Sequence, residues 1–157
     1  MAINTTFTSG NVLTAAQMNN LPRGFITYTY NTTAVIFNLL LTVQELFRAP
    51  AFTPVAGRVY RMTTTIGSVT KTTNIGNIDI TVRQDNIGGN VIDQSYFSAV
   101  ALGEVLPYSK TTIMTSTQMG TTLFTPLICV QANTAGMLIG NGGGYTGSFV
   151  IEDIGAA

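Results

Sequence analysis

The chain has 157 residues, a formal net charge of zero and only 9% charged residues, whereas 45% are hydrophobic and 16 are glycines. Ordinary soluble domains carry roughly 25% charged residues, so the surface here is made from uncharged polar residues, and the neutral chain has no long-range field for nucleic acid or an anionic membrane. The length suits one domain with a short appendage, and the scarcity of charge predicts that much of its surface is buried against copies of itself.

The sequence lacks the residues that several common catalytic and metal-binding sites require. The chain has no histidine, which removes Ser-His and Cys-His dyads and the commonest metal ligand. Its single cysteine, Cys129, cannot form an intrachain disulfide, and its place in an apolar run predicts a buried structural thiol. No run is long enough to span a membrane, and the first residues lack the pattern of a secretory signal, so we expect synthesis in a cytoplasm.

Residues 1–24 differ from the rest and are expected to form an N-terminal arm. Thr14 and Gln17 have capping-box spacing, which predicts a two-turn helix over 14–20 that Pro22 and Gly24 terminate. The alternative is a disordered leader, but the arm combines few charges with bulky apolar residues, which favours docking on another surface. The docking residues are expected to be Phe7, Val12, Leu13, Met18 and Leu21.

The next segments alternate between apolar and polar residues. Phe25 to Tyr30 is predicted to be a strand, whereas Ala34 to Arg48 fits a helix or a strand and is assigned here as strand. Phe52 to Ile66 reads as a strand, a turn at Pro54 and Gly57, and a second strand. Its alternation places Tyr60, Met62, Thr64 and Ile66 in the core and Arg61 outside.

The second half of the chain continues as short strands separated by turns. Gly67 to Gly76 is predicted to be a loop, followed by a strand at Asn77 to Gln84 and a tight hairpin at Asp85 to Asn90, in which two glycines would supply positive φ. A return strand is expected over Val91 to Val100, a connection over Leu102 to Pro107, a strand over Lys110 to Ser116 and a turn over Thr117 to Thr122. Leu123 to Gln131 is expected to be a strand buried on both faces near an edge or bulge. A further strand is expected to start at Met137 to Ile139, and the last strand is expected over Gly147 to Ile154.

About eight to ten short strands at roughly 8 to 12 residue spacing, with no helix long enough for a crossover, are typical of an antiparallel sandwich or jelly roll. We therefore expect an all-β, antiparallel β-sandwich of jelly-roll type over residues 25–157, preceded by the short helical arm of residues 1–24.

Three segments resemble, in the same order, a family of small tailed-bacteriophage virion proteins called minor tail, fibre or head-decoration proteins. They are FTSGNVLTAAQMNNLPRG near the start, FTPVAGRVYRMT in the middle and FVIEDIG at the end, with the loops from Gly67 to Pro107 unmatched. The resemblance implies a jelly roll, a homo-oligomer, usually a trimer, and attachment to other virion proteins through the N-terminal segment, after synthesis in the host cytoplasm. The family pattern commonly has a second basic residue after Gly57-Arg58, where this chain has Val59.

Candidate catalytic and metal sites are weak. Glu152 and Asp153 are adjacent on a strand, so they point to opposite faces and cannot form a facing acid/base pair; a solvated strand edge is expected. Asn141 to Gly144 resembles a phosphate cradle but lacks the lysine and the helix. Asp85, Asn86 and Asn90 offer oxygen ligands for calcium, but a hairpin turn explains them. We expect no catalytic residue, metal or cofactor.

A second hypothesis, from another class, is a receptor- or glycan-binding module at the tip of a fibre. Aromatic rings stack on pyranose rings, although tyrosines in strands are more often core or interface residues. The candidate residues are Tyr28, Tyr30, Tyr60, Tyr96, Tyr108 and Tyr145.

Overall fold

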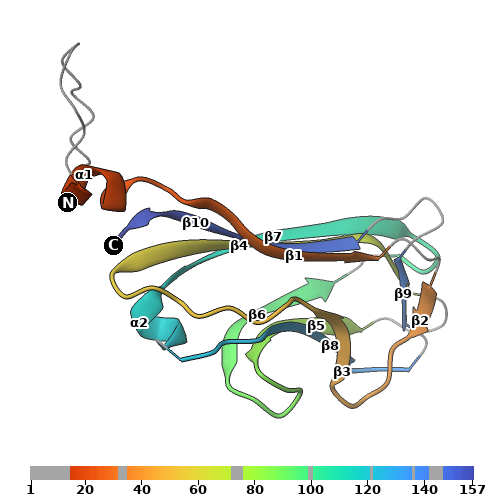
Figure 1. The fold of residues 1–157 in the computed structure, drawn as a ribbon. Helices are drawn as coiled ribbons and strands as arrows, with labels where there is room; N and C mark the ends of the chain where they lie inside the picture. Colours follow the sequence, from red (N-terminus) through yellow and green to blue (C-terminus); the bar gives the residue numbers. More distant parts are fainter. Residues whose placement is uncertain are drawn as a thin grey trace.

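A computed structural model of the chain describes residues 15–31, 35–71, 76–98, 101–120, 122–135, 137–141 and 147–157. Two antiparallel β-sheets face each other as layers, and both short helices lie at the same end of the sandwich, apart from each other (Figure 1). Within these ranges no helix is long and apolar enough to cross a membrane.

In the described part of the chain, six strands build one sheet and four build the other. The six-stranded sheet contains β1 (Gly24–Asn31), β2 (Val35–Asn38), β4 (Arg58–Lys71), β7 (Val105–Thr115), β9 (Met137–Asn141) and β10 (Gly147–Ala156). The four-stranded sheet contains β3 (Gln44–Arg48), β5 (Asn77–Gln84), β6 (Val91–Ser98) and β8 (Pro126–Ala132). The helices are α1 (Ala15–Asn20) and α2 (Ser116–Met119).

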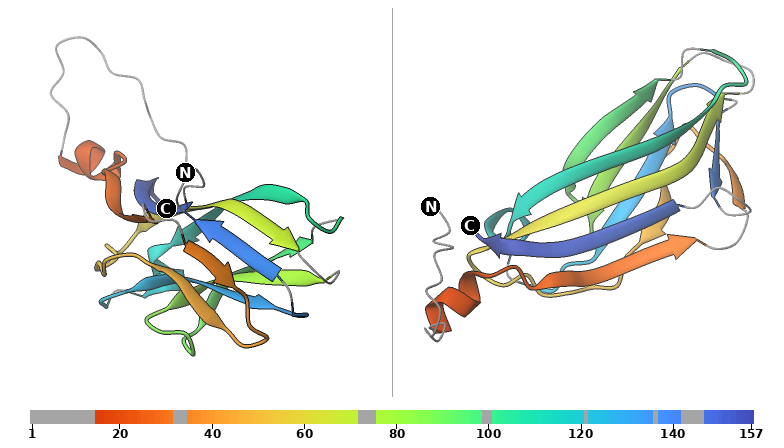
Figure 2. Two further views of the ribbon diagram at one scale, coloured as in Figure 1. Left: turned by 90° about the vertical axis from the view of Figure 1, so that its right-hand side faces the viewer. Right: turned by 90° about the horizontal axis from the view of Figure 1, so that it is seen from above.

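The strand order is that of a jelly roll. β1, β10, β4 and β7 lie side by side in one layer (Figure 2, right), and β3, β8, β5 and β6 follow one another in the other. Neighbours within a layer are mostly distant in the chain, because the chain repeatedly crosses between the layers, as two Greek keys require. β2 and β9 extend the first layer beyond the end of β10, where β9 pairs with Ser68 to Lys71 of β4. The predicted antiparallel β-sandwich of jelly-roll type is confirmed.

The core lies between the layers, and the alternation predicted for β4 is correct. Tyr60, Met62, Thr64 and Ile66 are buried, whereas Arg61 is exposed. The buried side chains of β4 meet inward side chains of the facing layer, which include Ile78, Ile80, Ile128 and Val130. Each fully buried large apolar side chain contributes roughly 1.5 to 3 kcal/mol of transfer free energy, so this double row is the main apolar contribution to folding.

Two segments expected as loops belong to strands. The predicted loop from Gly67 to Gly76 is wrong as far as Lys71, because β4 continues through it and pairs there with both β7 and β9. A register shift between Ile66 and Val69 bends the strand, and Ser68 and Val69 are buried despite the polar character of the stretch. Likewise β7 begins at Val105, inside the expected connection.

The first strand of the predicted motif from Phe52 to Ile66 is also corrected. Phe52 forms only an isolated bridge with Phe124 and does not pair with β4. The ambiguous segment from Ala34 to Arg48 contains two strands, β2 and β3, which belong to different layers. The strand assignment is confirmed, and the crossing between layers explains why no single period fits the segment.

β8 is buried on both faces, as predicted, but it is an inner strand between β3 and β5 and not near an edge. Pro126 is its first residue, a position where proline is tolerated. The turn expected around Gly120 contains α2, whose capping box pairs Thr115 with Gln118.

The hairpin between β5 and β6 is confirmed, but for a different reason. The residue with positive φ is Asp85, at 65°, and neither Gly88 nor Gly89 has one. Gly89 is needed because a Cβ there would lie 1.7 Å from the Gln84 carbonyl oxygen.

Candidate functional site

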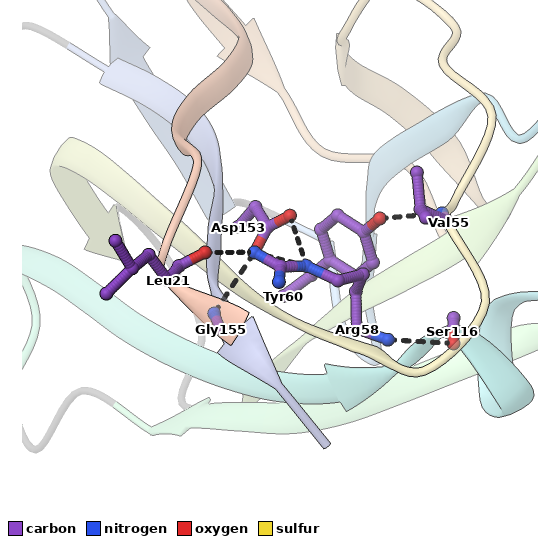
Figure 3. Close-up of polar contacts among 7 residues, drawn as sticks. All are labelled: Leu21, Val55, Arg58, Tyr60, Ser116, Asp153 and Gly155. Carbon is purple, nitrogen blue, oxygen red and sulfur yellow. Dashed lines mark hydrogen bonds and ion pairs between the residues drawn. The ribbon is translucent and has the colours of Figure 1, made fainter. Parts of the chain in front are cut away.

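A buried ion pair lies where the N-terminal segment joins the sandwich (Figure 3). Arg58, the first residue of β4, donates from Nε to both carboxylate oxygens of Asp153 on β10, at 3.1 and 2.8 Å, and from Nη2 to Oδ1 at 2.5 Å. Asp153 is fully buried, and Arg58 is 3% exposed. Desolvating two such charges is costly unless their hydrogen bonds are met, so the surrounding groups decide what the pair does.

The guanidinium also holds the N-terminal segment. Arg58 Nη2 donates to the backbone carbonyl oxygen of Leu21 at 2.6 Å, directly after α1. Three residues later, Gly24 pairs with Asp153 in the β1–β10 ladder. Both ends of the short connection from Leu21 to Gly24 are therefore attached to the sandwich.

Backbone groups complete the environment of the pair. The Gly155 amide donates to Asp153 Oδ1 at 3.0 Å. Gly155 has a φ of 133°, which disfavours any other residue, and a Cβ there would be in ordinary contact with the Asn20 carbonyl oxygen, at 3.5 Å. The end of β10 thus lies beside the C-terminal end of α1.

Side chains around Arg58 fix the turn that presents it. The Arg58 amide donates to the Ser116 hydroxyl at 3.4 Å, and the Tyr60 hydroxyl accepts from the Val55 amide at 2.8 Å (Figure 3). Ser116 is the first residue of α2, so four separate parts of the chain meet at the pair. Arg58, Asp153 and the Leu21 carbonyl, which we call the clamp, hold the root of the arm against the sandwich.

The pair corrects the expectation for the last strand. β10 lies between β1 and β4, so Asp153 is not on a solvated edge. The prediction that Glu152 and Asp153 face opposite ways is confirmed, because Glu152 meets Arg61 on the outer face at 2.8 Å. That outer ion pair raises the pKa of Arg61 through its hydrogen bond to Glu152 and the attraction between their charges.

Only part of the predicted attachment set can be placed. Phe7, Val12 and Leu13 lie outside the described residues, as does Thr14 of the expected capping box. The predicted helix is confirmed over Ala15–Asn20, where Met18 is 54% exposed. Leu21, whose backbone carbonyl oxygen accepts from Arg58, is half-buried.

A second candidate site is a row of aromatic side chains along the outer face of β1, an edge strand of the six-stranded sheet. Phe25, Tyr28 and Tyr30 are 56%, 47% and 57% exposed. The two tyrosine rings stack at 5.4 Å with 4° between their planes, and the Phe25 ring is tilted against Tyr28 at 5.2 Å. A bulge after Phe25 turns Phe25 to the tyrosine side and Ile26 toward the core, whereas strict alternation would place Ile26 with the tyrosines. We call these three residues the aromatic row.

The surface beside the aromatic row carries mainly hydroxyl groups. In the strand register, Tyr28 is followed across the sheet by Val150, Thr63 and Thr111, and Tyr30 by Ser148, Thr65 and Ser109. Phe25 is followed by the ion pair of Glu152 and Arg61, and then by Ile113. The outer face is therefore aromatic at its edge and nearly uncharged across its width.

Most of the other residues singled out in the sequence as candidate sites can be located in the structure. Cys129 is buried, as predicted, and this burial raises the pKa of its thiol to about 11. Asp85 accepts from the Thr125 amide, and Asn86 from the Gly88 amide, so both have hydrogen bonds within the hairpin. Among the described residues no three His, Cys, Asp or Glu side chains gather as metal ligands. Tyr145 and most of Asn141 to Gly144 lie outside those residues.

Sequence reasoning missed the clamp, although a signal for it exists. Inward and outward positions alternate along a strand. Arg58 is two and four residues before the buried Tyr60 and Met62, and Asp153 is two residues after the buried Ile151, so both charged residues stand at inward positions. Opposite charges at inward positions of two strands indicate a buried pair, since an unpaired buried charge is rarely tolerated.

Comparisons with known proteins add a likeness in fold. No protein-family model matches the chain, and no curated protein matches it in sequence. The VP2 subviral particle of infectious bursal disease virus matches with a TM-score of 0.55 at 9% identity, over 85% of this chain and 33% of that one. A structure of the Gx strain of the same virus gives 0.54 at 10% identity, over 83% and 32%. The chain thus spans about a third of the length of these proteins, and the likeness concerns the fold alone.

Proposed function

We propose that the chain is a structural virion protein that associates with copies of itself and is attached to the particle through residues 1–24. The observation that carries the proposal is the aromatic row: three large side chains exposed on the edge strand of a chain with only 9% charged residues. Exposed apolar patches of this kind mark interfaces, and the absence of net charge removes the repulsion between copies.

The stacking within the aromatic row favours a protein partner over a sugar. Tyr28 has the Tyr30 ring stacked on it and the Phe25 ring tilted against it, so its ring already packs against two aromatic neighbours. A partner surface can still pack on the exposed edges and hydroxyl groups, and the neighbouring threonines and serines suit a flat protein contact. A copy of the same chain fits, because the face is neutral and thus free of repulsion. The trimer is the assembly that the resemblance to phage proteins implies.

The clamp supports the role of the N-terminal segment. An attachment arm transmits force to its domain, and a backbone carbonyl held by a buried guanidinium is a firm connection. The jelly roll is also the fold of the VP2 subviral particle, which makes a building block of a particle a fitting function for this chain. The placement among tail, fibre or head-decoration proteins of a tailed bacteriophage rests on the three resembling segments.

Incorporation into particles tests the proposal. In the full chain, Phe7, Val12 and Leu13 are changed together to serine, which spares Leu21 and its bond to Arg58. Particles from the virus that encodes the chain are purified and their content of this protein is measured by mass spectrometry. We expect the variant to keep its mass in solution and its melting temperature but to be missing from particles.

The matched control is Leu123→Ser, which removes an exposed leucine from the sandwich and should be incorporated normally. Normal incorporation of the triple variant would place attachment on the sandwich. A triple variant that unfolds or becomes monomeric would show that the segment belongs to the fold. Electron microscopy of particles with the protein labelled then assigns it to the tail or the capsid.

A further inference from the structure

The outer face of the four-stranded sheet, on the side of the molecule opposite the aromatic row, has a hollow of about 90 Å³. Its polar lining comes from three neighbouring strands: Asp79, Thr81 and Arg83 of β5, Gln94 of β6 and Gln131 of β8. No residue of the clamp or of the aromatic row takes part in it. The hollow is therefore separate from the surfaces described above.

The strand register explains why these side chains converge. Alternation along β5 sends Asp79, Thr81 and Arg83 outward, while Ile78, Ile80 and Val82 are buried. Asp79 lies between Tyr96 on β6 and Gln131 on β8, and Thr81 lies opposite Gln94. Side chains opposite one another on one face of a sheet are only about 5 Å apart at Cβ, so the group forms one compact polar surface.

The hollow retains unused hydrogen-bonding capacity. Within the described part of the chain, the Asp79 carboxylate takes part in no hydrogen bond and no ion pair. Arg83 donates from Nε to the Thr81 hydroxyl and from Nη1 to the Gly89 carbonyl, both of which are neutral groups.

The two glutamines are held by their amide nitrogens. Gln94 Nε2 donates to the Tyr96 hydroxyl at 3.0 Å, and Gln131 Nε2 donates to the Leu41 carbonyl at 2.6 Å. Both side-chain carbonyl oxygens are left as acceptors, and their orientations are fixed in advance. Pre-positioned polar groups lower the entropy cost of binding a ligand.

The balance of these groups defines the ligand. The acceptor atoms of Asp79, Gln94 and Gln131 can each accept a hydrogen bond from a ligand, and Arg83 can donate one to it. A ligand rich in hydroxyl groups satisfies all four residues, because a hydroxyl group both donates and accepts. One carboxylate and one guanidinium leave the surface neutral, which gives no preference for phosphate or for a cation. Tyr96, 64% exposed beside Asp79, adds an aromatic surface for the C–H face of a sugar ring. We propose that this hollow binds a neutral saccharide.

The inference goes beyond the structural role proposed above and does not depend on it. Self-association is assigned to the six-stranded sheet, whereas the saccharide is assigned to the opposite layer. A failure of either assignment therefore leaves the other intact. An oligomer would present several copies of the hollow and raise the avidity for a surface that carries the saccharide.

The test uses full-length protein on an array of neutral oligosaccharides built from glucose, galactose, mannose, rhamnose and N-acetylglucosamine, with sialylated and phosphorylated glycans alongside. Saturation-transfer NMR in solution repeats each positive result. We expect saturable binding to at least one neutral saccharide. Asp79→Asn should weaken it by about tenfold or more, since hydrogen bonds to a charged group are worth roughly 1.5 to 3 kcal/mol.

A second variant, Gln131→Leu, should also weaken binding, whereas the control Glu152→Gln on the opposite layer should not change it. Asp79 has no partner to lose, so its variant should keep the melting temperature and mass of the unmodified protein. The proposal would be overturned if the protein bound no neutral saccharide, or if it bound charged glycans alone. It would also be overturned if Asp79→Asn and Gln131→Leu both left the binding of neutral saccharides intact.

Discussion

Arg58 and Asp153 stand at positions where the alternation of their strands would place apolar side chains. Their burial is tolerated because the pair has several further hydrogen bonds: the carboxylate has the guanidinium and the Gly155 amide, and the guanidinium has in addition the Leu21 carbonyl. Buried ion pairs seldom add net stability over apolar residues, but breaking one is costly. The clamp therefore fixes where the arm joins the sandwich more than it stabilises the sandwich.

Substitution of one partner of the clamp tests this view. Asp153→Asn should lower the free energy of unfolding by roughly 3 to 5 kcal/mol, because Arg58 is left buried without its counter-charge. Urea unfolding followed by circular dichroism is the measurement. The control is Glu152→Gln, which removes the exposed partner of Arg61 and should leave the midpoint nearly unchanged. Equal losses for both variants would contradict the clamp.

Cys129 gives a second prediction at this scale. Burial raises the pKa of its thiol to about 11, so the folded state favours the neutral thiol. Its contribution to stability is then complete below the unfolded value near 9.0 and is lost as the pH rises through about 11. We expect no reaction with a thiol reagent at pH 8 in the folded protein and full reaction after unfolding in denaturant. Rapid labelling of folded protein at that pH would show that Cys129 is accessible.

At the scale of elements, the chain's local signals located the strands well wherever one face is apolar and the other polar. β4 and β5 show this alternation, and the inward residues expected for β4 are the buried ones. The sequence was misleading where long-range pairing decided the structure. Gly67 to Lys71 looks like a loop by its serine, threonine and glycine content, yet it pairs on both sides. The clamp escaped notice because its partners are 95 residues apart.

The β5–β6 hairpin provides a test of an element. Gly89→Ala would force a Cβ against the Gln84 carbonyl, 1.7 Å away, which the backbone cannot accommodate without moving. We expect a loss of roughly 2 kcal/mol or more in the free energy of unfolding. Gly88→Ala is the matched control, because its Cβ would meet only the Asn86 side chain at 3.4 Å. Similar effects of the two substitutions, measured by urea unfolding, would mean that the turn has another geometry.

A polar seam joins the two layers between β6 and β7. Asp93 on β6 forms an ion pair with Lys110 of β7 at 2.6 Å and accepts a hydrogen bond from Thr112. Burial alone would raise the pKa of Asp93, but the hydrogen bonds from Lys110 and Thr112 and the charge of Lys110 outweigh it, so the pKa is lowered.

The seam should make stability depend on pH in a defined direction. A lowered pKa means that the contribution of Asp93 is present above its unfolded value and is lost as the pH falls through the folded one. Asp93→Asn should therefore melt at a lower temperature than the unmodified protein at pH 7, with the difference shrinking below pH 4. A difference that persists unchanged in acid would show that the charge of Asp93 is not what stabilises the seam.

On the scale of the whole molecule, we assign the two outer faces of the jelly roll to two proposed tasks. The six-stranded sheet carries the aromatic row and a nearly uncharged surface, which suits contact with copies of the chain. The four-stranded sheet carries the polar hollow. Sequence reasoning gave the fold class and the low charge that motivate self-association. The sequence alone could not show which features lie on which outer face, because the strand register decides which outward residues become neighbours.

The mass of the full-length protein in solution tests self-association most directly. Light scattering coupled to size exclusion at low micromolar concentration should give a single species of three times the 16.7 kDa of one chain. The combined substitution of Phe25, Tyr28 and Tyr30 by serine should reduce it to a folded monomer, because the aromatic row is lost from the contact. The control Tyr96→Ser, on the other layer, should keep the mass of the unmodified protein. A monodisperse 16.7 kDa species from the unmodified chain would contradict the account.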